Sequence, residues 1–251
     1  MPCTVPDPVS GPAPTPAPTP VPAPVPAPVR SSVLFFVGAS VCFVVPPLTL
    51  GLLVRDSPPP LALVAVALAE LVSAAVLVFW WLRRRSLSPS DVGLTSRHWV
   101  RDALLGAAIV PPRLLLEVGV LIPMAGGAEN PGVQEVLTSA SAGVAALAAT
   151  LVLGVVGGGL AEELYFRGFL LGALPKAFVH RKAALYGAAA VSVLLFSVLH
   201  LPTSGPDVAA IVLASVVYTG LFLLTRRLTA TVVSHSLWNV SAVFTVLAVY
   251  G

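Results

Sequence analysis

Charged residues are scarce in this chain of 251 amino acids. Asp, Glu, Lys and Arg make up only 10% of it, hydrophobic residues make up 57%, and the mean hydropathy is +0.93. Soluble globular domains carry about 25% charged residues, so the composition excludes an ordinary soluble enzyme or binding domain. The apolar residues come in runs of roughly 20, the length of a helix that crosses a bilayer. The sequence therefore predicts an integral membrane protein.

Cysteine is scarcer still. The two cysteines, Cys3 and Cys42, lie far apart in the sequence. They offer neither a disulfide framework nor a paired metal-ligand spacing. The HExxH motif of zinc peptidases is also missing, and no internal repeat is evident.

Proline, by contrast, is abundant at the N-terminus. Residues 1–30 alternate proline with Ala, Thr or Val. Because proline has no amide hydrogen to donate and fixes its own backbone angle, we expect neither helix nor sheet there. The sequence predicts a disordered, extended tail, which is either a solvated spacer or a ligand for a proline-recognising domain of unknown identity.

From residue 31 to residue 251 the hydropathy pattern predicts a transmembrane domain. Seven apolar spans are expected to form helices, which gives an all-α, polytopic helical membrane protein. The expected spans are residues 32–54, 61–82, 102–124, 142–172, 183–201, 208–225 and 229–249.

The basic residues indicate the orientation. The formal net charge is +3, and 11 of the 14 Lys and Arg residues fall on one side of the membrane when the seven spans are threaded through it. By the positive-inside rule that side is the cytoplasm, so the N-terminal tail is cytoplasmic and the C-terminus lies on the far side. We expect the plasma membrane as the location. The basic residues serve orientation, and nucleic acid is not implied as a partner.

Three charged residues lie in the fourth span, where lipid should exclude them. A charged, unpaired residue at the centre of a span costs about 2.5 to 3.5 kcal/mol, so each needs a partner or a function. Residues four apart lie on one face of a helix, which allows Glu163 to pair with Arg167. Glu162 is rotated about 100° from Glu163 and faces something else.

Two later spans carry histidines. The four-residue spacing puts Phe196 beneath His200, and it puts His235 in line with Asn239. Glu162, His200 and His235 lie at different depths when each is measured from the basic end of its helix. Helix tilt could reduce this difference in depth. We expect them to converge on one cavity open to the cytoplasm. A carboxylate and two imidazoles there could activate a water and stabilise an oxyanion.

Two further charged sites are left open by the sequence. Arg113 and Glu117 are spaced to pair beside Pro111 and Pro112, which favours a structural role. Glu70, alone in the second span, either lines the cavity or faces a neighbouring helix.

Three short motifs occur in order along the chain. They are EExxxR ("EELYFR", residues 162–167), FxxxH ("FSVLH", residues 196–200) and HxxxN ("HSLWN", residues 235–239). Together they resemble the motifs of the CPBP family of intramembrane proteases, which includes type II CAAX prenyl endopeptidases and bacterial proteins linked to bacteriocin self-immunity. The resemblance covers about residues 86–251, including a "DVGL" stretch, and residues 1–30 have no counterpart.

The resemblance implies a glutamate-dependent endopeptidase with its catalytic core at about residues 142–251. Glu162 would be the general base on the attacking water, and His200 would assist it. His235 and Asn239 would donate hydrogen bonds to the oxyanion of the tetrahedral intermediate. The supporting residues would be Glu163, Arg167 and Phe196. The partners would be membrane lipids and a peptide or membrane-anchored protein substrate, with no cofactor.

Three other functions remain possible from the residues. A zinc peptidase would use Glu162, His200 and His235 as ligands, although the HExxH spacing is missing. A transporter would usually show more polar residues along a path and internal repeats. A non-catalytic immunity or scaffold protein with the same fold would keep its phenotype in a Glu162→Ala variant.

Overall fold

The computed structural model describes Met1, residues 33–34, 37–38, 40–41, 43–45, 48–49 and 58–251. Apart from Met1, the predicted tail lies outside the described residues, as does much of the first predicted span, whose described positions are helical. Within the described part, six helices are long and apolar enough to cross a membrane, and there is no strand. The all-α polytopic class is confirmed, whereas the count of seven spans is not.

Each of the six spans matches a predicted one to within a few residues. They are α2 (Pro60–Arg84); α3 (Trp99–Leu116), continued by η2 (Glu117–Leu121) and α4 (Ile122–Met124); α6 (Val144–Val152), continued by η4 (Leu153–Ala173) and η5 (Leu174–Ala177); α7 (Arg181–Leu199); α8 (Gly205–Thr225); and α9 (Leu228–Tyr250). The shorter elements are η1 (Pro89–Val92), η3 (Gly127–Glu129) and α5 (Pro131–Ser141). The sequence did not predict α5.

The chain marks several helix starts with capping residues and proline. Asn130 caps α5, because its side chain accepts a hydrogen bond from the backbone N–H of Gly132. Ser204 caps α8 in the same way, because its hydroxyl accepts a hydrogen bond from the backbone N–H of Asp207. Proline occupies an early position of α2, α5 and α8, where its missing N–H would have no partner in any case. These signals end the loops and set where each helix begins.

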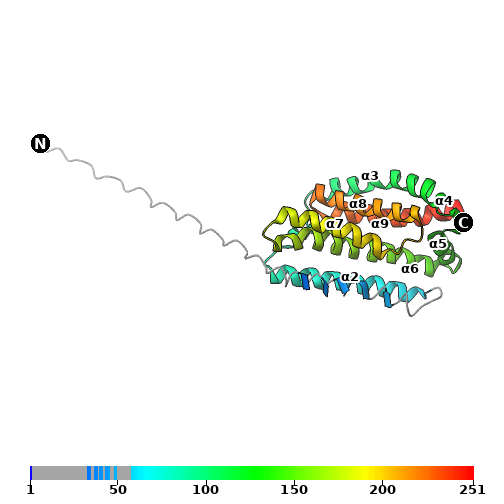
Figure 1. The fold of residues 1–251 in the computed structure, drawn as a ribbon, viewed down its shortest axis with the longest axis horizontal. Helices are drawn as coiled ribbons and strands as arrows, with labels where there is room; N and C mark the ends of the chain where they lie inside the picture. The colour runs from blue at the N-terminus through cyan, green and yellow to red at the C-terminus, as the bar shows by residue number, and fades with distance from the viewer. Residues whose placement is uncertain (2–32, 35–36, 39, 42, 46–47, 50–57) are drawn as a thin grey trace.

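The helix η4 is the centre of the bundle. It packs against α2 on one side and α9 on another, and α7 and α8 also contact it. Helix α3 packs mainly against α9, on the far side of the bundle from α2 (Figure 1). Most of the side chains of η4 from Glu163 onward are buried. Charges on this helix therefore meet protein groups rather than lipid.

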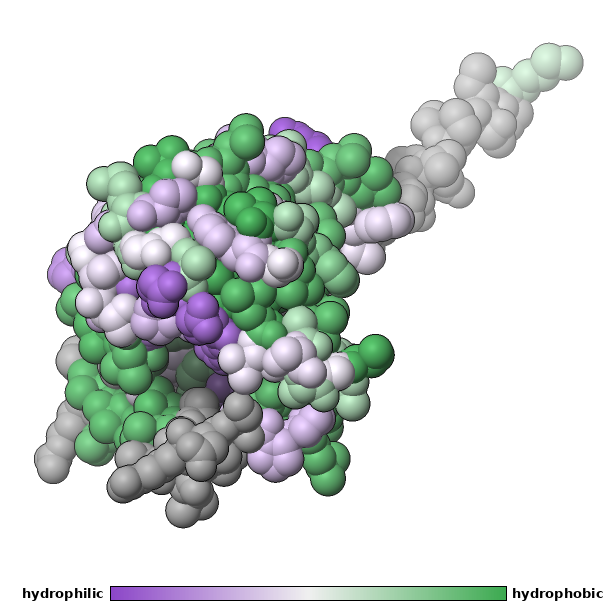
Figure 2. All heavy atoms as spheres, turned by 90° about the vertical axis from the view of Figure 1, so that its right-hand side faces the viewer, coloured by the Kyte–Doolittle hydropathy of each residue, from purple (hydrophilic) through white to green (hydrophobic). Residues whose placement is uncertain are grey.

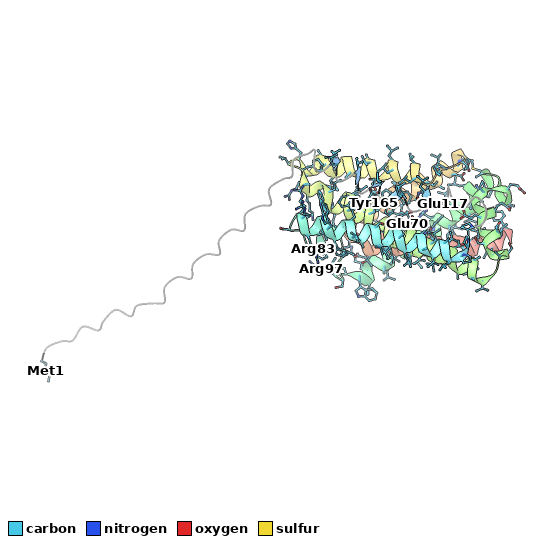
Figure 3. The ribbon with its side chains drawn as sticks, turned by 90° about the horizontal axis from the view of Figure 1, so that it is seen from below. Met1, Glu70, Arg83, Arg97, Glu117 and Tyr165 are labelled. Carbon is cyan, nitrogen blue, oxygen red and sulfur yellow. The ribbon has the colours of Figure 1, made fainter. Side chains whose placement is uncertain are left out.

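Basic residues gather at one end of the bundle. Arg83, in the last turn of α2, and Arg97, just before α3, lie at the same end of the bundle (Figure 3). Glu70 and Glu117 lie farther along the bundle. Two ion pairs join elements at this end, Asp102 with Arg227 and Asp91 with Lys176. The distribution agrees with the charge asymmetry on which the predicted orientation depends.

The opposite end carries the loops between α4 and α5 and between α7 and α8. Hydrophilic residues gather there, beside a hollow in the surface (Figure 2). Asn130 of one loop donates a hydrogen bond to Asp207 at the start of α8, with 3.2 Å between Nδ2 and Oδ1. This contact ties the two loops together.

Candidate active site

The helix that carries EELYFR is wound as a π-helix over Leu153–Ala173. Its first half holds four glycines, which are poor helix formers and leave room for side chains from α9. A Cβ atom at Gly158 would lie 2.8 Å from Asn239 Nδ2, and one at Gly159 would overlap the Ser236 hydroxyl. π-helical turns are found frequently at functional sites, and the winding therefore agrees with a site in this region.

Glu163 is fully buried and is held from two helices. Its Oε1 accepts hydrogen bonds from Arg167 Nη1 and from His235 Nδ1, each at 2.9 Å. The pairing with Arg167 was predicted from the four-residue spacing, and it is confirmed. The contact with His235, 72 residues along the chain, was not predicted. Arg167 also donates to the backbone carbonyl of Ser215 at 3.2 Å.

The imidazole of His235 has a fixed orientation. Nδ1 donates its hydrogen to Glu163, because a carboxylate paired with arginine can only accept. The ring stacks on Tyr218, with 4.5 Å between centroids and 20° between planes. Nε2 then points toward the glycine face of η4, where a Cβ atom at Gly158 would lie 3.3 Å from it.

Glu162 stands next to Glu163 but has a different environment. Its Oε2 is buried and has no hydrogen-bond partner among the residues that the structure describes. The carboxylate interacts electrostatically with His235, Glu163 and Arg167. Glu162 therefore shares a charge cluster with the histidine without being bound by it.

A second carboxylate from α2 approaches the same helix. Glu70 is buried, and a Cβ atom at Gly157 would lie 2.6 Å from its Oε2. Glu70 also interacts electrostatically with Glu162. The sequence left open whether Glu70 lines the cavity or faces a neighbouring helix. In the structure, Glu70 lies against the glycines of the neighbouring helix η4.

His200 follows α7 and stacks on Phe196, as the four-residue spacing predicted, with 4.3 Å between ring centroids. Nδ1 donates to the Phe196 carbonyl at 2.7 Å, because the carbonyl can only accept, so a neutral ring has its lone pair on Nε2. The Phe196 ring lies between the two histidines, 6.0 Å from His235. Within the described residues, no hydrogen bond joins His200 to Glu162.

Asn239 lies one turn beyond His235 and faces the same glycines. Its Nδ2 donates a hydrogen bond to the backbone carbonyl of Gly154 at 2.6 Å. The amide has two hydrogens, and this contact occupies one of them. The second remains available to a ligand beside Gly158.

A buried network behind His235 was missed by the sequence reasoning. Arg113 pairs with Glu117, with 2.6 Å between Nη2 and Oε1, as their spacing suggested. Arg113 Nη1 also donates to the Tyr218 hydroxyl at 2.6 Å, and Tyr218 in turn supports the His235 ring. Trp238 covers the other side of Arg113, at 4.7 Å from its guanidinium. Tyr218 sits in an apolar run that carries no motif, so the sequence held no signal for it.

A protein metal site needs several suitable side chains close together. Within the described part of the chain, no group of three or more His, Cys, Asp or Glu side chains is close enough to hold a metal ion.

The comparisons with known proteins agree with the motifs. Residues 144–241 match the family model described as type II CAAX prenyl endopeptidase Rce1-like, and this segment holds all three motifs. No curated protein and no solved structure matches the chain. The match over residues 144–241 supports the resemblance to the CPBP family of intramembrane proteases that the three motifs indicated.

Proposed function

We propose that the protein is an intramembrane endopeptidase that hydrolyses a peptide bond near the cytoplasmic face of the membrane. The observation that carries the proposal is the contrast between two adjacent glutamates. Oε1 of Glu163 binds both Arg167 and His235, whereas no hydrogen bond or ion pair among the described residues reaches Glu162; Oε2 is buried without a partner in both side chains. A carboxylate that is not held in an ion pair is available to accept a proton from an attacking water.

His200 assists Glu162 in this proposal. Its Nδ1 hydrogen is committed to the Phe196 carbonyl, so Nε2 of the neutral ring can only accept a hydrogen bond. A water held between this nitrogen and Glu162 loses its proton to the carboxylate as its oxygen attacks the scissile carbonyl. The proton then passes to the leaving amine as the carbon–nitrogen bond breaks.

His235 and Asn239 stabilise the oxyanion. Nδ1 of His235 is the donor to Glu163, so Nε2 can donate to an oxyanion only when the ring is an imidazolium. The Arg167 guanidinium balances the charge of Glu163, which lowers the cost of keeping that carboxylate within the membrane.

The remaining features of the proposed function concern its partners. The substrate is a peptide or a membrane-anchored protein, lipids surround the spans, and neither nucleic acid nor a cofactor takes part. The location is the plasma membrane, with the N-terminus in the cytoplasm. Metal analysis of the purified protein tests the absence of zinc, because stoichiometric zinc that survives purification would contradict it.

The test compares peptide termini in host membranes that contain the wild type or the Glu162→Gln variant. Glutamine keeps the size of the side chain and removes the base. We expect a specific set of termini to disappear in the variant, and those termini name the substrates. Glu135→Gln, which changes an exposed glutamate of α5, is the matched control and should leave the termini unchanged.

The non-catalytic alternative gives the opposite result. A scaffold or immunity protein would show the same termini with Glu162 or Gln at that position, provided that both proteins accumulate to the same level. That outcome would overturn the peptidase proposal while leaving the match to the family model unaffected.

A further inference from the structure

A pocket of about 280 Å³ lies at the basic end of the bundle, away from the candidate active site. Its walls come from η1, the end of η4, η5, the start of α7 and the end of α8. These are the points where the chain leaves the spans, so the pocket sits at the height of the lipid headgroups. Nothing in the proposed peptidase function uses it.

The charges of this pocket are unbalanced. Lys176, Arg181 and Arg226 line it together with a single carboxylate, Asp91. Lys176 Nζ pairs with Asp91 Oδ1 at 2.5 Å, which uses up that carboxylate. Among the described residues, neither Arg181 nor Arg226 forms an ion pair or a hydrogen bond through its side chain. The pocket thus holds two guanidinium groups without a counterion.

The turn between α8 and α9 fixes which arginine faces the pocket. Arg226 has a φ of 56°, in the left-handed region that non-glycine residues seldom adopt, and its N–H bonds to the Phe222 carbonyl at 2.7 Å. The next residue, Arg227, makes two hydrogen bonds to the buried carboxylate of Asp102. Two adjacent arginines therefore diverge: Asp102 anchors Arg227, while Arg226 lines the pocket.

The floor of the pocket is apolar. Leu171 and Phe222 are almost fully buried there, and Pro175 and Leu185 complete the surface. A cationic rim above an apolar floor fits a ligand with an anionic head and a hydrocarbon portion. Guanidinium groups bind phosphate oxygens in a bidentate manner, and basic pockets between spans on the cytoplasmic side favour anionic headgroups.

We propose that this pocket binds the phosphate headgroup of an anionic membrane phospholipid through Arg181 and Arg226. The phosphate lies between the two guanidinium groups, and the first carbons of an acyl chain rest on Leu171 and Phe222. This site is separate from the peptidase proposal, since it needs neither Glu162 nor either catalytic histidine.

The test measures lipid binding to the detergent-purified protein by native mass spectrometry. The probes are phosphatidylglycerol and the zwitterionic phosphatidylcholine. We expect the wild type to retain phosphatidylglycerol at least tenfold more strongly than phosphatidylcholine, and the Arg181→Gln/Arg226→Gln variant to lose this preference. Arg181→Lys/Arg226→Lys keeps the charge and should keep part of the binding.

The matched control removes two charges from the same end but outside the pocket. Arg83→Gln/Arg97→Gln changes exposed residues there and should leave the preference intact. An equal loss in both double variants would overturn the proposal, because binding would then follow the overall charge. If the Gln variant does not fold, Arg181→Gln alone, at an exposed position, gives the same comparison.

A competition experiment distinguishes a bound lipid from a bound free phosphate. Inorganic phosphate at millimolar concentration should not displace phosphatidylglycerol, because it lacks the hydrocarbon portion that contacts the floor. Displacement by inorganic phosphate would contradict the lipid assignment and assign the pocket to a soluble phosphate.

Discussion

Two neighbouring glutamates have different surroundings in this protein. Glu163 closes a buried ion network with Arg167 and His235, whereas Glu162 makes no hydrogen bond or ion pair with the described residues. Residue spacing alone predicted the Glu163–Arg167 pair and the Phe196–His200 stack, because both are local to one helix. It could not predict that His235 binds Glu163, since that contact depends on how α9 packs against η4.

Tyr218 connects two buried networks, and its hydroxyl can be removed without removing its ring. The Tyr218→Phe variant leaves the stack on His235 in place but takes the acceptor from Arg113 Nη1. A lost hydrogen bond to a charged group costs about 1.5 to 3 kcal/mol. We expect the free energy of unfolding to fall by that amount in denaturant titrations of the purified protein.

The control for this change is Tyr186→Phe. Tyr186 is exposed, and the structure gives its hydroxyl no partner among the described residues. Its removal should change the stability by less than about 0.5 kcal/mol. Equal effects in both variants would show that the Arg113–Tyr218 contact contributes nothing specific.

At the scale of elements, glycines set how closely the helices approach. A Cβ atom at Gly106 of α3 would lie 2.3 Å from the backbone carbonyl of Ala230 in α9. A backbone carbonyl cannot rotate away as a side chain could, so α3 and α9 would have to separate. The contact therefore depends on glycine at this position.

The Gly106→Ala variant tests this close approach. Overpacking of a well-packed interface costs about 1 to 3 kcal/mol, and we expect that loss in the free energy of unfolding. Gly220→Ala in α8 is the comparison, because no atom lies within 4 Å of its added Cβ. Alanine there should be neutral or stabilising by up to about 1 kcal/mol. A stable Gly106→Ala variant would refute the packing argument.

Hydropathy was sufficient to predict the second to seventh spans, because lipid requires long apolar helices wherever the chain crosses it. It was not sufficient for α5, a helix of 11 residues that begins at a proline and is too short to span. The π-helical winding of η4 was also missed. Side chains point in different directions around an α-helix and around a π-helix, and the sequence analysis assumed an α-helix. Glycines allow many backbone conformations, so a cluster of them does not indicate which winding forms.

At the scale of the whole molecule, the two ends of the bundle differ in chemistry. One end collects the arginines and lysines, and the other collects polar loops that include Glu129 and Asp207, beside a hollow (Figures 2 and 3). By the positive-inside rule, we propose that the basic end faces the cytoplasm. In this orientation the loop before α3 lies inside the cell, and the loop before α5 lies outside.

Cysteine labelling tests this orientation. In a variant with Cys3→Ser and Cys42→Ser, single cysteines are introduced as Ser96→Cys at the basic end and Ala128→Cys at the other, both at exposed positions. In intact cells, a membrane-impermeant maleimide should label only the cysteine at 128. Ser96→Cys should react only after the membrane is permeabilised. The reverse pattern would invert the topology and move the active site's access to the outer face.

We propose that Glu162 performs the chemistry while Glu163 maintains the structure. The most direct measurement counts the new peptide termini per folded molecule, comparing the wild type with Glu162→Gln and Glu163→Gln. We predict that Glu162→Gln folds normally and produces no specific termini. Glu163→Gln should lose about 3 to 5 kcal/mol of stability, because it leaves the buried Arg167 without its counterion. A folded Glu162→Gln protein that still generates the wild-type termini would contradict the claim.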